Sequence, residues 1–298
     1  MKLFAPSYYK DFVCIADACR HSCCIGWEID IDEDTKKKYE GITDPYGEVI
    51  RQSIEEGDTP HFSLGEHERC PHLDEKGLCR IISCLGDGCL CDICREHPRF
   101  YHETAHGIEV GIGMSCEEAC RLILTSDGYA QLEEIGEAEV RPLPDFDVLP
   151  LRSAAYAILA SPLSLEERLS ALSSHFSVSC DILTDEEWRN ALASLEYLHR
   201  EHRALFACYT GAPIALPKQT EAILTRALAY FIFRHASKAT DEGELCAAIG
   251  FSLFCTRLLA SLVKSGGDLF EHARTLSEEL EYSEDNTDAI MQEFFFSF

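Results

Sequence analysis

Cysteine is concentrated in the first part of this 298-residue chain, and this constrains the fold more than any other feature. Twelve of the sixteen cysteines lie before residue 121, and four of them fall between Cys14 and Cys24. The start, "MKLFAPSYYKDF", has no apolar region typical of a secretory signal. In such a chain, dense thiols at short spacings indicate metal binding or redox chemistry more often than structural disulfides. We therefore expect an irregular, cysteine-rich metal-binding module at the N-terminus.

Two further stretches hold thiols in pairs. The stretch "CPHLDEKGLC" carries Cys70 and Cys79 on either side of turn-forming residues, so a short hairpin would bring the two thiols together. The stretch "CDIC" supplies a second pair, Cys91 and Cys94. Zinc held by four thiolates and an iron–sulfur cluster both fit such pairs, and the spacing alone does not choose between them.

The adjacent residues Cys23 and Cys24 raise a separate question, because neighbouring side chains usually point apart and rarely reach one metal ion. Two metal centres, one multi-iron cluster with a spare thiol, or one structural cysteine would each explain the pair. The cysteines after residue 121 are instead expected to be buried as small apolar side chains. These are Cys180, Cys208, Cys246 and Cys255.

Charge and hydropathy narrow the class of protein. The chain has 26 basic and 52 acidic residues, a net charge of −26, and such a surface repels phosphate backbones, so no nucleic-acid partner is expected. A hydrophobic content of 46% is typical of a globular protein. No apolar run looks long enough to cross a bilayer. These features predict a cytoplasmic protein that does not act at a membrane.

Prolines separate the cysteine-rich part from the rest of the chain. Three of them fall between Pro142 and Pro150, which is incompatible with a continuous helix. The sequence therefore predicts a cysteine-rich metal-binding domain over residues 1–124, a linker over 125–150 and an α-helical domain over 151–298. The expected fold class is mainly α, with a helical bundle following the irregular module.

Helix signals recur throughout the later part. Ser164 with Glu167, and Thr184 with Glu187, form capping boxes that open helical runs, the second of them extending over residues 184–209. Residues 220–236 and 244–263 are apolar around most of their circumference, so we expect them to be central helices of a bundle.

The cysteine-rich part also contains local signals. "EDTKKKYE" favours a short helix, the Gly- and Pro-rich residues 44–68 favour loops, and residues 101–116 favour a β-hairpin that turns at His106 and Gly107. Ser115 with Glu118 predicts a further capping box. The motif "HETAH" matches a zinc-protease pattern, but in a strand its two histidines would lie about 13 Å apart, so we predict no protease site.

Four stretches in order carry a family resemblance: "FVCIADACRHSCCIGWEIDID", "CPHLDEKGLCRI", "LCDICREHPRF" and "MSCEEACRLIL". Their cysteine pattern resembles that of the flagellin lysine N-methylase family. Further along, "AYFIFRHA" is similar to a Tyr/Phe-rich family helix that ends in arginine, and "LSEELEYSEDN" is similar to a late helix followed by Glu and Asn.

The resemblance implies a set of metal ligands. The family pattern falls on Cys14, Cys19, Cys23, Cys24, Cys70, Cys79, Cys94 and Cys116, with Cys91 a frequent companion. Cys84, Cys89 and Cys120 look like additions in this chain. The implied centre is an iron–sulfur cluster, 4Fe–4S favoured, or zinc.

The activity that the resemblance implies is methyl transfer from S-adenosylmethionine to lysines of a protein substrate, flagellin or a similar one. A lysine must lose its proton before its nitrogen attacks a methyl group, so a base or a desolvated site is needed. Glu28, Asp30, Asp32 and Tyr8 are candidates, and the sequence does not select among them. The alternative is a non-catalytic zinc- or iron-binding or electron-transfer module, with the helical part as a docking scaffold.

Overall fold

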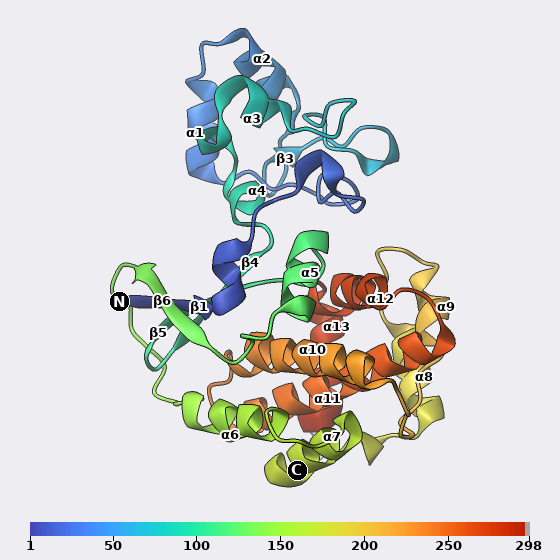
Figure 1. Cartoon of the computed structure of the whole chain (residues 1–298). Helices are drawn as coiled ribbons and strands as arrows, with labels where there is room; N and C mark the ends of the chain where they lie inside the picture. The colour runs from blue at the N-terminus through green and yellow to red at the C-terminus, as the bar shows by residue number, and fades with distance from the viewer. Residues whose placement is uncertain (296–298) are drawn as a thin grey trace. The chain divides into compact units, whose positions relative to one another are not determined.

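The computed structural model describes residues 1–295, apart from the side chain of Cys180, and is mainly helical (Figure 1). This confirms the mainly α fold class. The chain divides into two compact units. Residues 13–99 and 116–118 form one of them, the cysteine-rich unit, and residues 1–12, 100–115 and 119–295 form the other, the helical unit. The division into domains 1–124 and 151–298 joined by a linker stays a prediction.

Short elements make up the cysteine-rich unit. Asp32 caps its first α-helix, because the carboxylate accepts a hydrogen bond from the backbone N–H of Thr35. The elements are η2 (Ala16–Ala18), α1 (Glu33–Glu40), α2 (Pro45–Gln52), β2 (Ile54–Glu55), β3 (His61–Phe62), η3 (Glu66–Glu68), α3 (Arg80–Leu85), η4 (Asp87–Cys89) and α4 (Asp92–Glu96). The helix expected at "EDTKKKYE" is therefore confirmed as α1.

Helix α2 lies in a stretch that we expected to be loops, and that expectation was wrong. Asp44 caps the helix by accepting from the backbone N–H of Tyr46, and Pro45 occupies the first turn, where a missing N–H costs nothing. Tyr46 and Ile50 are buried on one face of the helix. The cap, the proline and the apolar face together stabilise this helix. It has eight residues, which is too short to show a clear hydrophobic period in the sequence.

The core of the cysteine-rich unit mixes apolar side chains with thiols. Its buried residues are Ile29, Ile31, Tyr39, Tyr46, Ile50, Phe62, Cys70, Ile81 and Cys91. The side chains of Cys24, Cys79, Cys89 and Cys94 pack against them and are partly buried. Several predicted metal ligands therefore belong to the hydrophobic core of this unit.

A four-stranded mixed sheet runs in the order β4-β5-β1-β6. The strands are β1 (Lys2–Pro6), β4 (Arg99–Thr104), β5 (Gly107–Ile112) and β6 (Leu132–Glu137). The neighbouring strands β4 and β5 confirm the predicted hairpin at His106 and Gly107. Strand β1 pairs with β5 in parallel and with β6 antiparallel. Strand β6 lies within residues 125–150, which we interpreted as a linker. Its pairing with β1 places residues that are far apart in the sequence side by side.

The remaining elements of the helical unit are helices. They are η1 (Ser7–Asp11), α5 (Glu117–Thr125), α6 (Leu149–Leu159), α7 (Leu165–Phe176), η5 (Cys180–Ile182), α8 (Asp185–Ser194), α9 (His202–Phe206), α10 (Lys218–Ala236), α11 (Glu242–Ser265), α12 (Leu269–Leu276), the π-helical turn η6 (Ser277–Glu281) and α13 (Glu284–Phe295). The first two residues of α5, Glu117 and Glu118, belong to the cysteine-rich unit.

Two of the three predicted capping boxes are confirmed. At the start of α7 and of α8, the Ser164–Glu167 and Thr184–Glu187 pairs form both reciprocal hydrogen bonds. The third prediction was wrong. The hydroxyl of Ser115 is buried and makes no hydrogen bond within the described residues, and α5 begins only at Glu117.

Helices α10 and α11 pack against each other at the centre of the helical unit, as predicted. Both are buried on most sides, and Gly266 ends α11 with a φ of +100°. Contrary to our expectation from the sequence, α11 is long and apolar enough to cross a membrane by length and composition alone. Its most apolar window is 83% buried inside the structure, which is typical of a core helix.

The run expected to be helical over residues 184–209 is broken into α8 and α9. The backbone of the intervening segment is held by side chains from the end of the chain. Asn286 bonds both the N–H and the C=O of Glu196, and Glu279 accepts from the N–H groups of Leu198 and His199. These hydrogen bonds replace those that a continuous helix would make, which explains why local sequence alone did not predict the break.

Candidate functional site

The predicted metal ligands of the cysteine-rich unit fall into two sets. In the first set, Cys19 lies near Cys14 and Cys116, and the thiols influence one another electrostatically. Glu117 fixes this arrangement, because its carboxylate accepts hydrogen bonds from the backbone and the side chain of Arg20 at 2.8 and 3.0 Å and lies 3.8 Å from the Cys19 sulfur. The segment around Cys19 is thereby held at the start of α5.

The second set gathers around the core of the unit. It consists of Cys24, Cys70, Cys79, Cys91 and Cys94, which influence one another's ionisation. The backbone N–H of Cys70 donates to the C=O of Cys24 at 2.8 Å.

The predicted hairpin brings Cys79 into this second set. Asp74 and Leu78 share a backbone hydrogen bond of 2.9 Å, and Leu73 pairs with Cys79 across the turn. Gly77 has a φ of +80°, a conformation that favours glycine at the turn.

Cys23 and Cys24 divide between the two sets. Cys23 is influenced by Cys14 and Cys116 of the first set, whereas Cys24 influences Cys70 and Cys79 of the second. A hydrogen bond between the two adjacent thiols raises the pKa of Cys23 and lowers that of Cys24 to about 7. The two thiols are therefore in contact with each other, and their assignment to one centre or to two stays a prediction.

Burial and pairing set the ionisation of the other thiols. Burial raises the pKa values of Cys19 and Cys70 to about 11 in each case, and also raises that of Cys79. The hydrogen bond between Cys91 and Cys94 lowers the pKa of Cys91 and raises that of Cys94. Ionised thiols therefore need compensation here, and a bound cation would supply it.

These sets are not a preformed metal cage. Within residues 1–295, three His, Cys, Asp or Glu ligand atoms come within 4.8 Å of one another in one group only, and that group contains no cysteine. In a tetrahedral zinc site with Zn–S bonds of about 2.3 Å, the sulfurs lie roughly 3.8 Å apart. The ligand assignment therefore stays a prediction, although the soft thiol donors fit zinc or an iron–sulfur cluster.

The remaining cysteines lie elsewhere. Cys84 is exposed, Cys89 packs against the core of the cysteine-rich unit, and Cys120 is buried in the helical unit, where its thiol contacts the C=O of Phe270 at 3.5 Å. Of the later cysteines, Cys255 is buried as predicted, Cys208 and Cys246 are partly buried, and the side chain of Cys180 lies outside the described residues.

The candidate bases occupy different positions. Glu28 and Asp30 are exposed, and Asp32 is used as the cap of α1, while Tyr8 belongs to the helical unit, where burial raises the pKa of its phenol well above its usual value. The two histidines of "HETAH" also lie in different environments. His102 is buried on β4, whereas His106 contacts Asp147 at 3.0 Å.

A buried polar cluster in the helical unit was not predicted. Its centre is Glu281, whose carboxylate contacts the Nε2 of His235 at 2.7 Å and accepts from the hydroxyl of Tyr230 at 3.2 Å. That hydroxyl accepts from Arg234 at 2.9 Å and from the backbone N–H of Met114 at 3.1 Å. These residues come from "AYFIFRHA", "LSEELEYSEDN" and "MSCEEACRLIL", so three stretches that carried the family resemblance meet in one place.

Charges in this cluster compensate one another. Burial disfavours the charged forms of Arg234 and Glu281. Their attraction to each other outweighs this effect, together with the interactions of Arg234 with Tyr230 and of Glu281 with His235. As a result, the pKa of Arg234 is raised and that of Glu281 is lowered. Burial lowers the pKa of His235 to about 4. Gly113 permits the close approach, because an added Cβ would lie 2.3 Å from the Tyr282 hydroxyl. Gly113 thus has a packing role.

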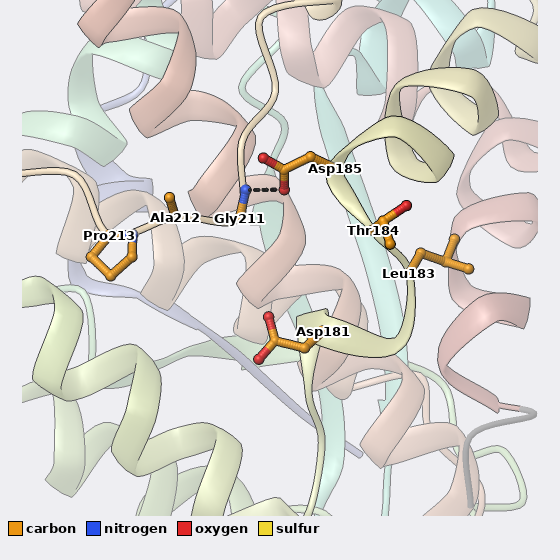
Figure 2. Close-up of a pocket in the computed structure, with 7 residues that line it drawn as sticks. All are labelled: Asp181, Leu183, Thr184, Asp185, Gly211, Ala212 and Pro213. Atoms are coloured by element: carbon orange, nitrogen blue, oxygen red, sulfur yellow. Dashed lines mark hydrogen bonds between the residues drawn. The ribbon is translucent and has the colours of Figure 1, made fainter.

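Two pockets occur in the helical unit. Figure 2 shows the first, of about 470 Å³, lined by Asp181, Leu183, Thr184, Asp185, Gly211, Ala212 and Pro213. Asp185 there accepts from the N–H of Gly211 at 2.8 Å, so its carboxylate holds the loop. The second pocket, of about 480 Å³, borders the buried cluster at His235 and is also lined by Lys238, Asp288, Met291 and Phe295. Burial lowers the pKa of Lys238.

Comparisons with known proteins identify relatives. The chain is 31% identical over 139 residues to the lysine-N-methylases of Salmonella choleraesuis (strain SC-B67) and Salmonella typhimurium (strain LT2), and the match covers 43% of this chain. It spans 34% of the length of those relatives. It is also 30% identical over 139 residues to the flagellar biosynthetic protein FliU of Salmonella muenchen, of which 80% is covered.

No family model matches the chain, and no solved structure matches it. The coverage of FliU is nevertheless extensive. This chain belongs to the family that contains these Salmonella lysine-N-methylases and FliU.

Proposed function

We propose that this member of the lysine-N-methylase and FliU family is a protein-lysine N-methyltransferase that uses S-adenosylmethionine and acts on flagellin or a similar protein. The observation that carries the proposal is the match to the Salmonella lysine-N-methylases. The match to FliU, which is named a flagellar biosynthetic protein, supports flagellin as the substrate. We place the reaction in the cytoplasm, where reducing conditions would keep the free thiols available.

We further propose a cysteine-bound metal centre in the cysteine-rich unit, an iron–sulfur cluster rather than zinc. The first ligand set would be Cys14, Cys19, Cys23 and Cys116, and the second Cys24, Cys70, Cys79 and Cys94 with Cys91. The electrostatic grouping of the thiols supports these two sets, which would serve either two centres or one multi-iron cluster. An iron–sulfur cluster would supply electron transfer or substrate binding, and its ligands need not follow the ferredoxin spacing.

The pocket beside His235 is our candidate for the place where the acceptor lysine enters. An acceptor lysine must be deprotonated to attack a methyl group, and this pocket already lowers the pKa of its own lysine, Lys238, by burial and by the charge of Arg234. The same burial, with Lys238 as a neighbouring cation, would lower the pKa of an entering lysine. Met291 and Phe295 offer apolar surface for its stem.

Intact-mass analysis of flagellin from the host, co-expressed with this chain or with a Cys79→Ser variant, tests the activity. We expect methyl-mass increments on lysine-bearing peptides with the intact protein and a loss of increments with the variant. Soluble, metal-loaded protein that yields no increments and binds no S-adenosylmethionine would overturn the proposal. It would favour the alternative of an electron-transfer or zinc-binding module with a helical docking scaffold.

The pocket assignment has its own test. Lys238→Gln should lower kcat and move the pH–rate profile to higher pH, because the acceptor lysine would then lose its proton only at higher pH. Lys264→Gln, which changes an exposed lysine on α11 of the same unit, should leave the profile unchanged. Equal profiles for the two variants would remove the pocket from the mechanism without affecting the proposed activity.

A further inference from the structure

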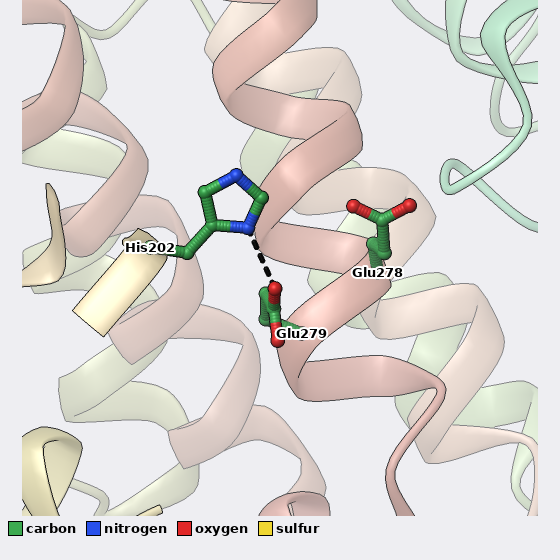
Figure 3. A group of neighbouring side chains, drawn as sticks. All are labelled: His202, Glu278 and Glu279. Carbon is green, nitrogen blue, oxygen red and sulfur yellow. Dashed lines mark hydrogen bonds and ion pairs between the residues drawn. The ribbon is translucent and has the colours of Figure 1, made fainter. Parts of the chain in front are cut away.

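One histidine and two glutamates converge in the helical unit, apart from all the cysteines. The ligand atoms of His202, Glu278 and Glu279 lie within 4.8 Å of one another (Figure 3). His202 begins α9, whereas the glutamates are consecutive residues of the π-helical turn η6. Turns of this kind are rare and recur at functional sites. The convergence therefore joins two segments that are about 75 residues apart in the sequence.

Among the three side chains, Glu278 has a buried oxygen whose position the packing of the described residues does not explain. Its side chain is 9% exposed. One carboxylate oxygen, Oε1, accepts from Arg274 at 2.8 Å, but the other, Oε2, is buried without any hydrogen-bond partner in the described part of the chain. Burying a carboxylate oxygen without a partner is costly, because the oxygen gives up its hydrogen bonds to water and gains none in return. A ligand that contacts Oε2 would remove this cost.

Glu279, by contrast, is oriented by the protein itself. Its carboxylate accepts from the backbone N–H groups of Leu198 and His199 at 2.8 and 3.1 Å. Nδ1 of His202 lies 2.6 Å from the same carboxylate. The carboxylate and the imidazole are therefore held in place side by side, as Figure 3 shows, and the imidazole of His199 lies edge-on to that of His202 at 5.1 Å.

We propose that His202, Glu278 and Glu279 form a binding site for a divalent first-row cation such as Mn²⁺. Imidazole and carboxylate donors suit these ions, and the set differs from the soft thiols of the cysteine-rich unit. Arg274 compensates one negative charge here and is shared with Glu271 at 3.1 Å, so a second positive charge is still needed.

Binding requires only small movements. Metal–ligand bonds of about 2.0–2.2 Å place the donor atoms of one ion roughly 3–3.5 Å apart, so side-chain rotation within the present 4.8 Å is sufficient. The proton that lies between His202 Nδ1 and Glu279 moves to Nε2 or to solvent when the ion binds. The site is independent of the proposed methyl transfer.

Titration of the whole chain with Mn²⁺, followed by electron paramagnetic resonance of the free ion, tests the site. We expect about one equivalent to bind. Glu278→Gln keeps the shape of the side chain and should weaken binding at least tenfold, as should His202→Gln. Glu271→Gln removes a carboxylate from the same Arg274 without removing a ligand, so it should change binding less than about twofold.

Three results would overturn the proposal: no Mn²⁺ binding by the intact chain, equal binding by the intact chain and Glu278→Gln, or equal losses in Glu278→Gln and Glu271→Gln. If circular dichroism shows that Glu278→Gln does not fold, His202→Gln decides. Nitrogen hyperfine coupling to bound Mn²⁺ should be present in the intact chain and absent in His202→Gln. Because the readout is binding, a negative result leaves the proposed methyl transfer untouched.

Discussion

The cysteine-rich unit and the helical unit are stabilised in different ways. In the cysteine-rich unit the longest helices, α1 and α2, have eight residues each, and strands β2 and β3 have two. In the helical unit, α10 and α11 have 19 and 24 residues and are buried on most sides. Short elements bury little apolar surface for the backbone that they order, so small irregular units generally need cross-links or metals. The cysteines are found where packing is weakest.

The two units also treat charge differently. The helical unit buries ion pairs such as Glu109 with Arg152, whose side chains are 2% and 3% exposed. The ion pairs of the cysteine-rich unit lie at its surface, as Lys36 with Glu56 does. Buried pairs depend on both partners being present, whereas surface pairs contribute little. Each unit therefore has its own weak point.

The largest effect is expected from loss of the proposed metal. Cys79→Ser, or chelation of the intact protein, should reduce bound metal and expose the backbone of the cysteine-rich unit to hydrogen exchange, while the helical unit stays protected. The free energy at stake is on the order of 10 kcal/mol for structural metal sites. Cys208→Ser, in the helical unit, is the control and should keep the full metal content. Unchanged metal and protection in Cys79→Ser would refute the ligand assignment.

In the helical unit, the largest loss of stability is expected from breaking a buried ion pair. Arg152 bonds the carboxylate of Glu109 through two nitrogens at 2.5 and 2.6 Å, so Arg152→Met leaves a buried carboxylate unpaired. We expect a loss of about 3–5 kcal/mol in urea unfolding of this unit, without loss of metal. Arg141→Met, which breaks an exposed contact to Glu103, should cost less than about 1 kcal/mol. Similar losses in the two variants would contradict the contrast between buried and exposed pairs.

Acid should destabilise the helical unit through His235. Burial lowers the pKa of this imidazole in the folded state to about 4, against an ordinary 6.5. Between these values the unfolded chain takes up a proton that the folded one refuses, so this contribution is complete above pH 6.5 and falls as the pH decreases toward 4. We expect a loss of roughly 2 kcal/mol between pH 7 and pH 5 in urea unfolding.

The substitution His235→Gln separates this effect from other titrating groups. The amide can still donate to Glu281, but it does not titrate. The dependence on pH should therefore become flatter by about the amount assigned to His235. A variant with the same slope as the intact protein would show that His235 is not the group responsible.

The smallest effects concern helix caps, and they differ between the units. Ser164→Ala removes the cap of α7 and should cost about 1 kcal/mol. Asp32→Ala should cost about 2 kcal/mol, because this carboxylate accepts from the N–H of Thr35 in α1 and from that of Asp92 in α4, at 2.8 and 2.9 Å. Thermal melts of the two variants provide the comparison. Equal losses would mean that the contact to Asp92 contributes nothing.

Sequence reasoning succeeded where the determining contacts are local. The capping boxes at Ser164 and Thr184, the turn between Cys70 and Cys79, and the hairpin at His106 each depend on residues a few positions apart. It failed where local signals competed with distant ones or were too short. The cap predicted at Ser115 does not form, and α2 appears in a stretch rich in glycine and proline.

The candidate sites could be predicted from the sequence only in part. The cysteine pattern gave the list of proposed ligands, but only the folded chain shows that the thiols of Cys23 and Cys24 contact each other. The family-like stretches around Arg234 and Glu281 were recognised singly, and their meeting with Gly113 was not. Side chains that meet from distant segments leave no spacing that a sequence pattern can reveal.

By itself the sequence determined the helical class, the concentration of thiols and the starts of helices α1, α7 and α8, because hydrophobic period and capping act over a few residues. The tertiary structure alone decided which thiols lie together and where the run after Thr184 breaks. Glu279 and Asn286 end that helical run by bonding its backbone from about 80–90 residues away. A backbone hydrogen bond is made with whichever partner the completed fold brings close, and no local preference encodes that choice.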